Sequence, residues 1–452
     1  ACRVIRSCRK LGVKTVAVYS EADATAPHVK LADEAVAIGP PAVRESYLRI
    51  DRIISAARET GAQAVHPGYG LLSENANFAR ALEKEGITFV GPTPAVLERF
   101  GDKLKARHFA REAGVPPPPG TDDAIDAGDE ARLIAEAERI GYPLLVKAAG
   151  GGGGIGMKIV KREKTLIRAV ESCADRGAAS FGDARVYLER YVSSPKHIEV
   201  QILADAHGTV LALGDRECSM QRRHQKVIEE APSVAPIFAG EEGDRRRAVL
   251  HQAAVRLAKE AGYVGAGTVE FVASEEGELF FLEVNARLQV EHPVTEMCAG
   301  IDLVEQQLRV ASGEALQPDL FAKGLTGHAI EARIYAEDPA KRFAPQPGHI
   351  DRLVWPSERP GLRIDSGIEE GQDVSPYYDP LLAKVVVHGP DRATAIENLA
   401  AALAETTIEL TGPMGPAKTN TSFCRELLLS DRFGDATYDT AVAETMAKAL
   451  ST

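Results

Sequence analysis

The sequence is poor in cysteine, has no long hydrophobic run and carries no excess of basic residues. Its 452 residues include 6 cysteines, which lie far apart and form no CxxC pair, so a disulfide framework is not expected and a reducing compartment fits best. Charged residues interrupt every long apolar stretch, and no run approaches the ~20 residues that a membrane-spanning helix needs. The 53 Lys and Arg against 65 Asp and Glu give a net charge of −12, which disfavours a nucleic-acid coat or a polybasic membrane anchor. An anionic ligand must therefore meet a local basic pocket.

The first 91 residues alternate between strand and helix patterns, as in a doubly wound α/β domain. Apolar residues at Val4, Ile5, Cys8 and Leu11 indicate the end of an amphipathic helix closed by Gly12. A parallel-sheet unit normally places a strand and a turn before its first helix, so we expect the start of this domain to be missing. Strands are predicted at 13–19, 34–39, 62–68 and 87–92, and helices at 47–59 and 75–84.

The length of 452 residues corresponds to about three domains at roughly 150 residues each. A helical linker is predicted over 92–119, and the prolines at 116–119 mark its end because they cannot continue a helix. A small α/β unit follows over 120–191, and a strand-rich unit over 192–324. The last unit, 325–448, mixes short strands with a helix near 393–404.

Five consecutive glycines, 150–154, follow a predicted strand that ends in Lys147. Glycine lets backbone amides approach phosphate oxygens without a clashing Cβ, and so long a run suits a mobile lid. No Lys-Ser or Lys-Thr pair follows the run, which excludes a Walker loop, and the spacing does not match a dinucleotide fingerprint. A flexible hairpin turn is the alternative interpretation.

A predicted hairpin with its turn at 274–277 is the most informative segment. This turn places Glu270 opposite Phe281 and therefore on the same face as Glu283. Strand alternation adds Asn285 to that face. Hard oxygen ligands at this spacing suit Mg²⁺ that bridges nucleotide phosphates.

If the second strand extends to residue 292, Arg287, Gln289 and Glu291 join the same polar row. Such a row offers metal ligands together with a clamp for an anion. A solvated strand face is the alternative, since exposed strand faces also alternate in this way.

A basic cluster, Arg222, Arg223, His224 and Lys226, stands out in a chain of negative net charge. It suits a small anion, but charge runs are also common on solvated surfaces, and the sequence does not decide between the two. The acidic residues on either side offer salt-bridge partners. They are Asp215, Glu217, Glu229 and Glu230.

Several single residues carry weaker signals. His66 and Tyr69 follow a predicted strand at its carboxyl end, where open α/β sheets bind ligands, but His-Pro-Gly is also an ordinary turn. Arg333 suits an ion pair with a core carboxylate. Cys218 near Lys226 suggests a thiolate, although a buried inert cysteine is more common.

Together these segments resemble the biotin carboxylase component of biotin-dependent carboxylases, an ATP-grasp family, over essentially the whole chain. The motifs HPGYGLLSEN at 66–75, RRHQKVIEEAP at 222–232 and NARLQVEHPVTE at 285–296 are specific to that family. The glycine lid and the Glu/Glu/Asn set are shared by ATP-grasp enzymes generally. The resemblance implies a multidomain α/β and α+β fold: a doubly wound, Rossmann-like N-terminal domain, an ATP-grasp lid and core, and a C-terminal mixed β-sheet domain.

The implied reaction has two stages. Bicarbonate attacks the γ-phosphate of ATP to give carboxyphosphate, and its CO₂ then carboxylates the ureido nitrogen of biotin. In this scheme Glu291 is the base that removes the bicarbonate proton, and Arg333 stabilises the biotin enolate. The implied catalytic set is Arg287, Glu291, Lys226 and Arg333.

The resemblance also assigns binding roles to residues of this sequence. The residues implied to bind ATP are Lys103, Lys147, Gly153, Gly154, Glu189, Arg190, Tyr191, Val192, His197, Gln221, His224, Glu270 and Glu283. The implied magnesium ligands are Glu270, Glu283 and Asn285. Bicarbonate and biotin are implied to meet Lys226, Arg287, Gln289, Val290, Arg333 and Tyr69.

The resemblance implies ATP and Mg²⁺ or Mn²⁺ as cofactors, a biotin carboxyl carrier and a carboxyltransferase as partners, a homodimer or a larger complex, and a cytoplasmic location. No Ala-Met-Lys-Met biotinylation site occurs in the sequence, so biotin is expected on a partner or on a further part of a longer chain. Ile155 stands where the family usually has Lys or Arg, which puts one phosphate contact in doubt.

Alternatives are an ATP-grasp ligase that joins a carboxylate to an amine, and a non-catalytic nucleotide-binding or scaffold protein. The final carboxyl acceptor, an acyl-CoA, pyruvate or urea, is not encoded here.

Overall fold

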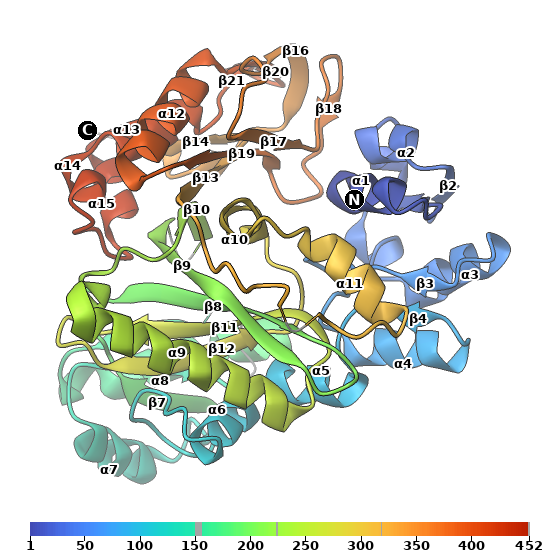
Figure 1. The fold of residues 1–452 in the computed structure, drawn as a ribbon. Coiled ribbons are helices and arrows are strands. Elements are labelled where there is room, and N and C mark those ends of the chain that lie inside the picture. Colours follow the sequence, from blue (N-terminus) through green and yellow to red (C-terminus); the bar gives the residue numbers. More distant parts are fainter. Residues whose placement is uncertain (150–155, 223–224, 318, 451–452) are drawn as a thin grey trace.

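The computed structural model describes residues 1–149, 156–222, 225–317 and 319–450 (Figure 1). The predicted lid glycines Gly153 and Gly154, together with Ile155, Arg223 and His224, lie outside the described residues.

The N-terminal region has two pairs of parallel strands flanked by helices. Within the described residues these pairs form separate two-stranded sheets, whereas the sequence analysis expected one doubly wound array. The strands are β1 (Val16–Tyr19), β2 (Glu34–Ala37), β3 (Ala64–Val65) and β4 (Thr88–Phe89). The helices are α1 (Cys2–Lys10), α2 (Pro27–Leu31), α3 (Ile50–Glu59) and α4 (Ala76–Lys84).

Local signals account for the ends of these helices. Gly12 follows α1 with a φ of 70°, a left-handed conformation that suits glycine. The Asn75 side chain accepts a hydrogen bond from the backbone N–H of Phe78 at the start of α4, as an N-cap residue should. Helix α3 begins at Ile50, three residues later than the pattern at 47–59 predicted.

Helices α5 (Pro94–Gly101) and α6 (Lys103–Glu112) form the predicted helical linker. Asp102 caps α6 by accepting hydrogen bonds from the backbone N–H groups of Leu104 and Lys105. This cap places Lys103 at the first position of the helix, and α6 packs against strand β12 (Leu279–Asn285).

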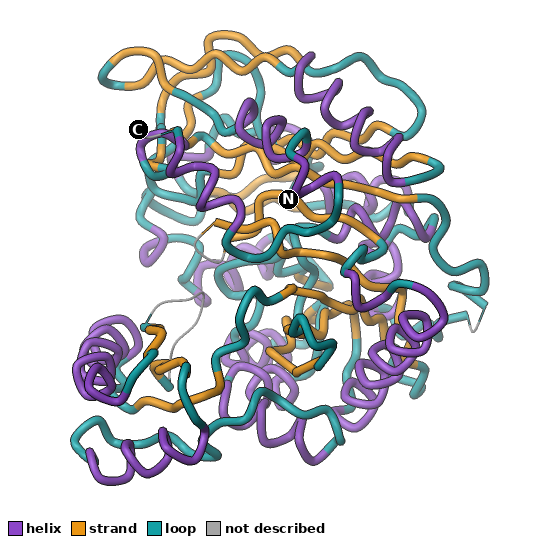
Figure 2. The backbone as a smooth tube through the Cα atoms, turned by 90° about the vertical axis from the view of Figure 1, so that its left-hand side faces the viewer, coloured by secondary structure: helices purple, strands orange, loops and turns teal. Residues whose placement is uncertain are grey.

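A small unit with one antiparallel sheet follows, and Figure 2 shows it as a separate layer at the lower left. The order of its strands is β6-β5-β7. Leu144, Val146, Val186 and Leu188 share one hydrophobic core with its helices. The strands are β5 (Leu144–Ala148), β6 (Met157–Val160) and β7 (Val186–Arg190), and the helices are α7 (Glu130–Ile140) and α8 (Leu166–Phe181).

The centre of the molecule is an eight-stranded antiparallel sheet with the order β12-β11-β8-β9-β10-β13-β19-β17. The strands not yet given are β8 (Lys196–Ala204), β9 (Val210–Arg222), β10 (Gln225–Ala231), β11 (Gly265–Ala273), β13 (His328–Tyr335), β17 (Leu362–Ser366) and β19 (Leu381–Gly389). Helix α9 (Gly240–Ala261) crosses this sheet in Figure 1 and buries Leu250, Ala254 and Leu257 against it. The sheet is continuous across residue 324, where the sequence predicts a domain boundary. That boundary stays a prediction.

Two short helices, α10 (His292–Ala299) and α11 (Leu303–Ala311), follow β12. Helix α10 contacts strands β9, β10, β13 and β19. Its first turn is therefore placed against the middle of the central sheet, which matters for the site described below.

The C-terminal region adds a second, smaller sheet and four helices. Helix α12 covers the whole range that the sequence predicts, 393–404, and one more residue at each end, and the Asp391 side chain caps it. The small sheet has the order β18-β16-β20-β21, and β14 pairs with β15. The strands are β14 (Glu337–Asp338), β15 (Ala344–Pro345), β16 (Gly348–Val354), β18 (Asp373–Val374), β20 (Thr407–Gly412) and β21 (Gly415–Ala417). The helices are α12 (Arg392–Glu405), α13 (Thr421–Leu428), α14 (Asp431–Gly434) and α15 (Val442–Ala449).

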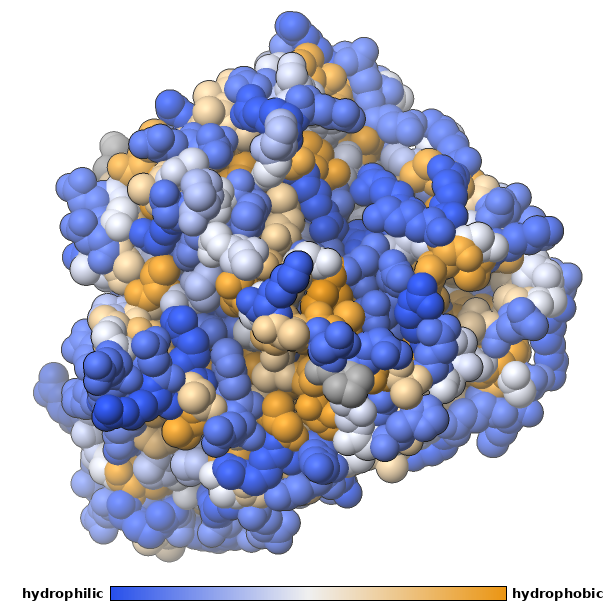
Figure 3. Space-filling model, in the orientation of Figure 1, coloured by the Kyte–Doolittle hydropathy of each residue, from blue (hydrophilic) through white to orange (hydrophobic). Residues whose placement is uncertain are grey.

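The surface seen in Figure 3 is largely hydrophilic, with hydrophobic residues scattered between charged ones. Among the described residues, no helix is both long and apolar enough to cross a membrane.

A buried carboxylate, Glu230, ties the C-terminal helices to the central sheet. It accepts hydrogen bonds from His328 Nε2 at 2.6 Å, from Arg392 Nε at 2.6 Å and from the Tyr438 hydroxyl at 2.5 Å. Burial disfavours ionisation of Glu230, but His328 and Arg392 outweigh it and lower the pKa to about 2. The folded state therefore keeps this carboxylate charged.

Replacing Glu230 with Gln should destabilise the fold, because it leaves the largely buried Arg392 guanidinium without its charged partner. We expect a loss of about 3–5 kcal/mol at neutral pH. The folded pKa of Glu230 lies below the ordinary value of 4.5. The loss of unfolding free energy should therefore have its full size above pH 4.5 and shrink as the pH falls toward about 2. Denaturant unfolding over this pH range measures it. Glu426→Gln, an exposed carboxylate on α13, is the control, and equal effects of the two changes would contradict the argument.

Candidate active site

The centre of the candidate site is the ammonium group of Lys226 on β10. Its Nζ atom lies 2.5 Å from Glu199 Oε2, 2.5 Å from Glu291 Oε1 and 3.1 Å from Glu270 Oε1. Burial disfavours the charged form of Lys226, but the acidic groups around it outweigh this effect and raise its pKa. Lys226 therefore stays charged and holds strands β8, β10 and β11 together with the start of α10.

Glu291, the N-cap residue of α10, is held from two sides. Its second carboxylate oxygen accepts a hydrogen bond of 2.8 Å from the Arg333 guanidinium on β13. Burial opposes ionisation of Glu291, but Lys226, Arg333 and Arg216 together hold its pKa well below the ordinary value. The proton-accepting form of Glu291 is therefore the populated one at neutral pH.

A second guanidinium, Arg216 on β9, is completely buried below Lys226. It donates to Glu199 Oε1 at 2.5 Å, to Thr268 at 3.1 Å and to the Thr295 hydroxyl on α10 at 2.9 Å. Arg216 thus fixes the carboxylate that holds Lys226, and it also ties α10 to the sheet.

The carboxylate of Glu270 lies on the other side of Lys226. It accepts hydrogen bonds from Asn285 at 2.7 Å, from Gln289 at 2.9 Å and from His197 Nε2 at 2.8 Å. Burial opposes ionisation, but Lys226 and His197 hold the pKa of Glu270 far below its usual value. The predicted magnesium ligands Glu270 and Asn285 are therefore in contact.

The hairpin that carries these residues has a different register from the predicted one. Ala273 pairs with Leu279 and not with Glu278, and the register shifts once more between Glu270 and Phe271, so Glu270 pairs with Glu283 and not with Phe281. The loop runs to Glu278, whose carbonyl accepts from the Ser274 N–H. The prediction that Glu270 and Glu283 share a face is nevertheless confirmed, because directly opposed residues lie on one side of the sheet.

The second strand ends at Asn285, so the extension to residue 292 is not observed. Arg287, Gln289 and Glu291 converge on the site from the segment that follows. The Arg287 guanidinium donates to Asn285 Oδ1 at 2.9 Å, to Gln289 Oε1 at 3.0 Å and to Glu74 Oε2 at 2.9 Å. Glu74 belongs to the predicted HPGYGLLSEN motif, which therefore contributes to the site from the N-terminal region.

Two lysines from other elements approach the same region. Lys103 on α6 lies 3.2 Å from Glu283 Oε2. Lys147 on β5 pairs with Glu189 Oε1, and Arg107 donates to Glu189 Oε2 at 2.8 Å. Burial opposes ionisation of Glu189, but these cations lower its pKa. This ion-pair group joins the lid strands to the linker helix.

The basic cluster is not a solvated face where the structure describes it. Arg222 and Lys226 are each 9% exposed, and Arg222 pairs with Glu337. The neighbouring acidic residues bind more distant partners: Asp215 lies 3.0 Å from His251, and Glu229 accepts from Arg333 at 2.5 Å. Arg222 and Lys226 therefore face inward, and their described ion pairs are with residues of other segments.

The remaining predicted site residues lie around this centre. Lys384 Nζ donates to the Val290 carbonyl at 2.6 Å and lies 5.9 Å from the centroid of the Tyr69 ring. Gln221 Nε2 lies 2.8 Å from His197 Nδ1. On the lid side, Arg190 pairs with Glu278 at 2.5 Å, the Tyr191 N–H donates to the Pro143 carbonyl and Val192 is buried. Gly153, Gly154 and His224 lie outside the described residues.

The sequence analysis missed several residues that hold the site. Glu199, Arg216, Glu74 and Lys384 contact predicted residues. Strand alternation offers a signal for Glu199, which lies two residues from His197 on the same strand. Arg216 gives no comparable signal, because its partners come from other strands and from α10.

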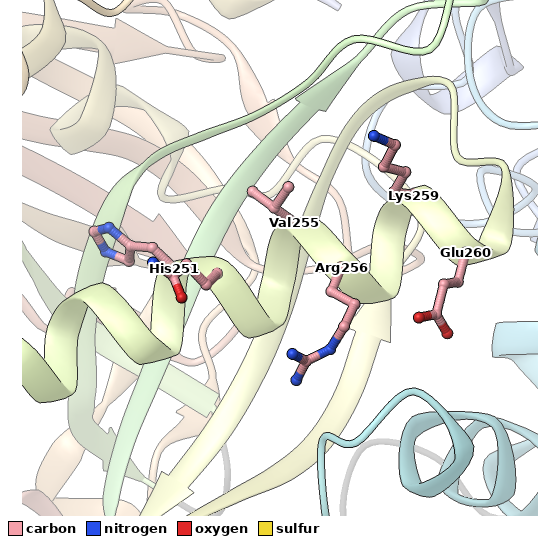
Figure 4. A pocket seen from close by; sticks show the side chains of 6 residues that line it. His251, Val255, Arg256, Lys259 and Glu260 are labelled. Atoms are coloured by element: carbon pink, nitrogen blue, oxygen red, sulfur yellow. The ribbon is translucent and has the colours of Figure 1, made fainter.

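A hollow of about 430 Å³ lies elsewhere, on the outer side of α9 (Figure 4). Its described lining, which includes His251, Arg256 and Lys259, contains none of the predicted site residues. The candidate site is therefore the buried network around Lys226 and not this hollow.

Comparisons with known proteins agree with that placement. The chain matches the models for the biotin carboxylase N-terminal domain over residues 1–97, the carbamoyl-phosphate synthase L chain ATP-binding domain over 102–318 and the biotin carboxylase C-terminal domain over 331–445. A biotin carboxylase of Halalkalibacterium halodurans is 50% identical over 409 residues, which are 90% of this chain and 88% of the relative. The chain belongs to the biotin carboxylase family.

Further relatives show the range of this family. The propionyl-CoA carboxylase alpha chain of Ruegeria pomeroyi is 49% identical. The match covers 89% of this chain and 61% of that longer relative. A solved structure, the biotin carboxylase domain dimer of Hydrogenobacter thermophilus 2-oxoglutarate carboxylase with MgADP, ADP and bicarbonate, has a TM-score of 0.91 and 41% identity. The match covers 100% of this chain and 96% of that one.

The chain is therefore a ligase of the biotin carboxylase type. Its reaction is the ATP-dependent carboxylation of biotin, the first half-reaction of a biotin-dependent carboxylase. The family assignment favours this reaction over the two alternatives, an amine-forming ATP-grasp ligase and a non-catalytic nucleotide-binding protein. The expected multidomain ATP-grasp fold is confirmed.

The cations around Glu291 supply a test of the site. Replacing Lys226 with Met should raise the pKa of Glu291, because the largest favourable charge beside it is removed. The acid limb of bicarbonate-dependent ATP cleavage should then move to higher pH, by at least about one pH unit. The pH profile of kcat/KM for bicarbonate measures this shift. Lys448→Met, at an exposed pair with Glu444, is the control, and an unmoved acid limb in folded Lys226→Met would contradict the proposed electrostatics.

Proposed function

We propose that bicarbonate and biotin react at the buried network of Lys226, Glu291 and Arg333, and that ATP binds between this network and the lid. One observation carries the proposal: Glu291 is held between Lys226 at 2.5 Å and Arg333 at 2.8 Å. Two cations bound to one carboxylate can exchange hydrogen bonds from that carboxylate to an anionic substrate. The same cations face the segment that carries Arg287 and Gln289.

On the nucleotide side, Lys103 and Lys147 are the cations placed to hold phosphates. Both are bound to carboxylates, Glu283 and Glu189, which phosphate oxygens can replace as partners. The lid glycines Gly153 and Gly154 would add backbone donors, and His197, Gln221, His224 and the 189–192 segment would hold adenine and ribose. These assignments follow the family resemblance residue by residue.

Glu270, Glu283 and Asn285 fit a magnesium ion. The two carboxylates are opposed in register, and the Glu283 side chain is 35% exposed, so its oxygens are open to an incoming ligand. Carboxylate and amide oxygens are the ligands that Mg²⁺ or Mn²⁺ prefers. When bound, the ion would neutralise charge on the ATP phosphates.

In the first stage, Glu291 takes the proton of bicarbonate, and the freed oxygen attacks the γ-phosphorus of ATP. The bond from this phosphorus to the leaving ADP oxygen breaks as carboxyphosphate forms. Lys226, Arg287 and Gln289 orient the bicarbonate, which supplies most of the catalysis in phosphoryl transfer together with charge neutralisation.

In the second stage, the carbon–oxygen bond between the carboxyl carbon and the phosphate oxygen of carboxyphosphate breaks to give CO₂ and phosphate, the phosphate accepts the ureido N–H proton of biotin, and the nitrogen bonds to the carbon of CO₂. Arg333 would stabilise negative charge on the ureido oxygen as it develops, an effect felt mainly in the transition state. The Val290 backbone and Tyr69 would line the same pocket.

Biotin is proposed to arrive on a carrier protein or carrier domain, because the sequence has no Ala-Met-Lys-Met site. A carboxyltransferase would use the product, and its acceptor is an acyl-CoA, pyruvate or urea. A homodimer or larger complex is proposed by analogy with the Hydrogenobacter thermophilus dimer. The six cysteines are free and buried, which supports a reducing, cytoplasmic setting.

Glu283→Gln tests the metal assignment. Loss of one carboxylate ligand should raise the Mg²⁺ concentration needed for half-maximal ATP cleavage and lower turnover by orders of magnitude. A magnesium titration of ATP cleavage measures both values. The control is Glu275→Gln in the exposed turn of the same hairpin. Near-normal turnover and magnesium dependence in folded Glu283→Gln would remove Glu283 from the metal site.

Glu291→Gln and Arg333→Ser test the division between the two stages, and each is the control for the other. Glu291→Gln should lower bicarbonate-dependent ATP cleavage by about 10²-fold or more, because the base is lost. Arg333→Ser should lower biotin carboxylation by a similar factor, with ATP cleavage in the absence of biotin less affected and ATP affinity nearly unchanged. Biotin carboxylation is measured with free biotin, and ATP cleavage is measured with bicarbonate in the absence of biotin. Equal losses in both assays from folded Arg333→Ser that binds ATP normally would refute its assignment.

A further inference from the structure

Two buried carboxyl groups beside Arg333 have no role in the scheme above. Glu229 on β10 lies directly opposite Glu331 on β13, and both side chains are fully buried. Glu229 Oε1 accepts a hydrogen bond of 2.5 Å from Arg333 Nε. Among the described residues, Glu229 Oε2 and both carboxyl oxygens of Glu331 have no hydrogen-bond partner.

Three unpartnered carboxylate oxygens in one buried place would be costly if both groups were ionised, because neither water nor a donor would compensate their charge. Directly opposed residues of an antiparallel pair have Cβ atoms about 4.5–5.5 Å apart, within reach of a bond between carboxyl groups. A single proton on Glu331 turns one unpartnered oxygen into a donor and gives it an acceptor, Glu229 Oε2. The same proton removes one of the two negative charges.

The cations nearby are already engaged. Arg333 binds Glu229 and Glu291, and Lys226 binds Glu291. Lys384 donates to the Val290 carbonyl and stays 3.9 Å from Glu331 Oε2, beyond hydrogen-bonding distance. No described cation is thus bonded to Glu331.

The charged and titratable groups that surround the pair come from every neighbouring element. Those that act on the pair directly are Arg333 on β13, Lys226 on β10, Lys384 on β19, Glu291 at the start of α10 and Cys424 on α13. Beyond them, Tyr335 contacts Arg333, and Asp365 on β17 and His292 on α10 interact with Lys384. Burial raises the pKa of Glu331 to about 8 against the effect of Lys384, and burial also raises the pKa of Glu229 against the effect of Arg333. The direction agrees with the geometry.

We propose that Glu229 and Glu331 share one proton, and that this acid pair acts as a positioning element that keeps Arg333 available to the biotin anion. The second part rests on the role proposed for Arg333 above. With the proton in place, the pair opposes Arg333 with one negative charge. Loss of the proton adds a second, which binds the guanidinium more tightly and cancels more of its charge.

The biotin-dependent step should therefore fall at alkaline pH. Bicarbonate-dependent ATP cleavage without biotin depends on Glu291 and Lys226 and should fall less over the same range. A pair that served only to fill the core would not distinguish between these two rates.

Glu331→Gln mimics the shared proton permanently, since its amide is neutral and can donate to Glu229. At neutral pH this variant should keep biotin carboxylation within about threefold of the unchanged enzyme. The alkaline limb of biotin carboxylation should move up by at least about one pH unit or disappear. Glu331→Leu has no donor and should be slower at all pH values. Glu337→Gln, at a buried carboxyl whose partner is Arg222, is the matched control and should leave the limb in place.

The proton itself has a readout that does not depend on activity. Infrared spectra of the unchanged enzyme at neutral pH should contain the carbonyl band of a buried protonated carboxyl, and this band should disappear at alkaline pH and in Glu331→Gln. Absence of the band in the unchanged enzyme overturns the shared proton, whether or not the variants fold. A band that is present, with an alkaline limb that Glu331→Gln leaves unmoved, overturns the positioning role.

These outcomes are separate from a failure of the proposed function. If Arg333→Ser lowers both rates equally, the assignment of Arg333 fails, and the link from the pair to biotin fails with it. The infrared band then still decides whether Glu229 and Glu331 share a proton.

Discussion

Lys226 holds its ammonium group within hydrogen-bonding distance of Glu199, Glu270 and Glu291 in a region that excludes solvent. None of these charges could be buried alone, because desolvation of a single ion costs several kcal/mol even after relaxation. Arg216 and Arg333 supply the further positive charge that three carboxylates require. The site is therefore a set of ions that must assemble together, and the fold has to bring their elements to one place.

The continuous central sheet meets this requirement. Five of its strands are consecutive neighbours, in the order β11-β8-β9-β10-β13. Each carries one charged residue of the site, so five side chains reach one region: Glu270, Glu199, Arg216, Lys226 and Arg333. Glu291 cannot come from the sheet, and it enters as the N-cap of α10. The bond from Arg216 to Thr295 fixes that helix, so one guanidinium orients both the sheet and the loop side of the site.

The sequence allowed much of this to be predicted, and the misses have physical reasons. Alternation placed Glu270, Glu283 and Asn285 on one face, and this held because the register error at Glu270 was two residues, from Phe281 to Glu283, which leaves the face unchanged. The register itself was wrong by two residues: one comes from the turn, which pairs Ala273 with Leu279, and one from the irregularity between Glu270 and Phe271. The resemblance singled out Lys226, Glu291 and Arg333, which the structure brings into contact, while their roles stay predictions. The pairing of β10 with β13, which opposes Glu229 and Glu331, joins segments about a hundred residues apart and leaves no local pattern.

The low pKa of Glu291 raises a question about its role as a base, because a carboxylate stabilised by two cations accepts a proton weakly. The contacts of Glu291 with Lys226 and Arg333 suggest how its pKa can rise during the reaction. Lys226 and Arg333 are the cations proposed to engage bicarbonate and biotin, and a cation that turns toward a substrate oxygen gives less stabilisation to Glu291. Substrate binding should therefore raise the pKa of Glu291 only when the proton to be removed is in place. The cations that stabilise the Glu291 carboxylate in the free enzyme would then stabilise the reacting anions instead. Glu291 would thereby become a stronger base without any change in the surrounding fold.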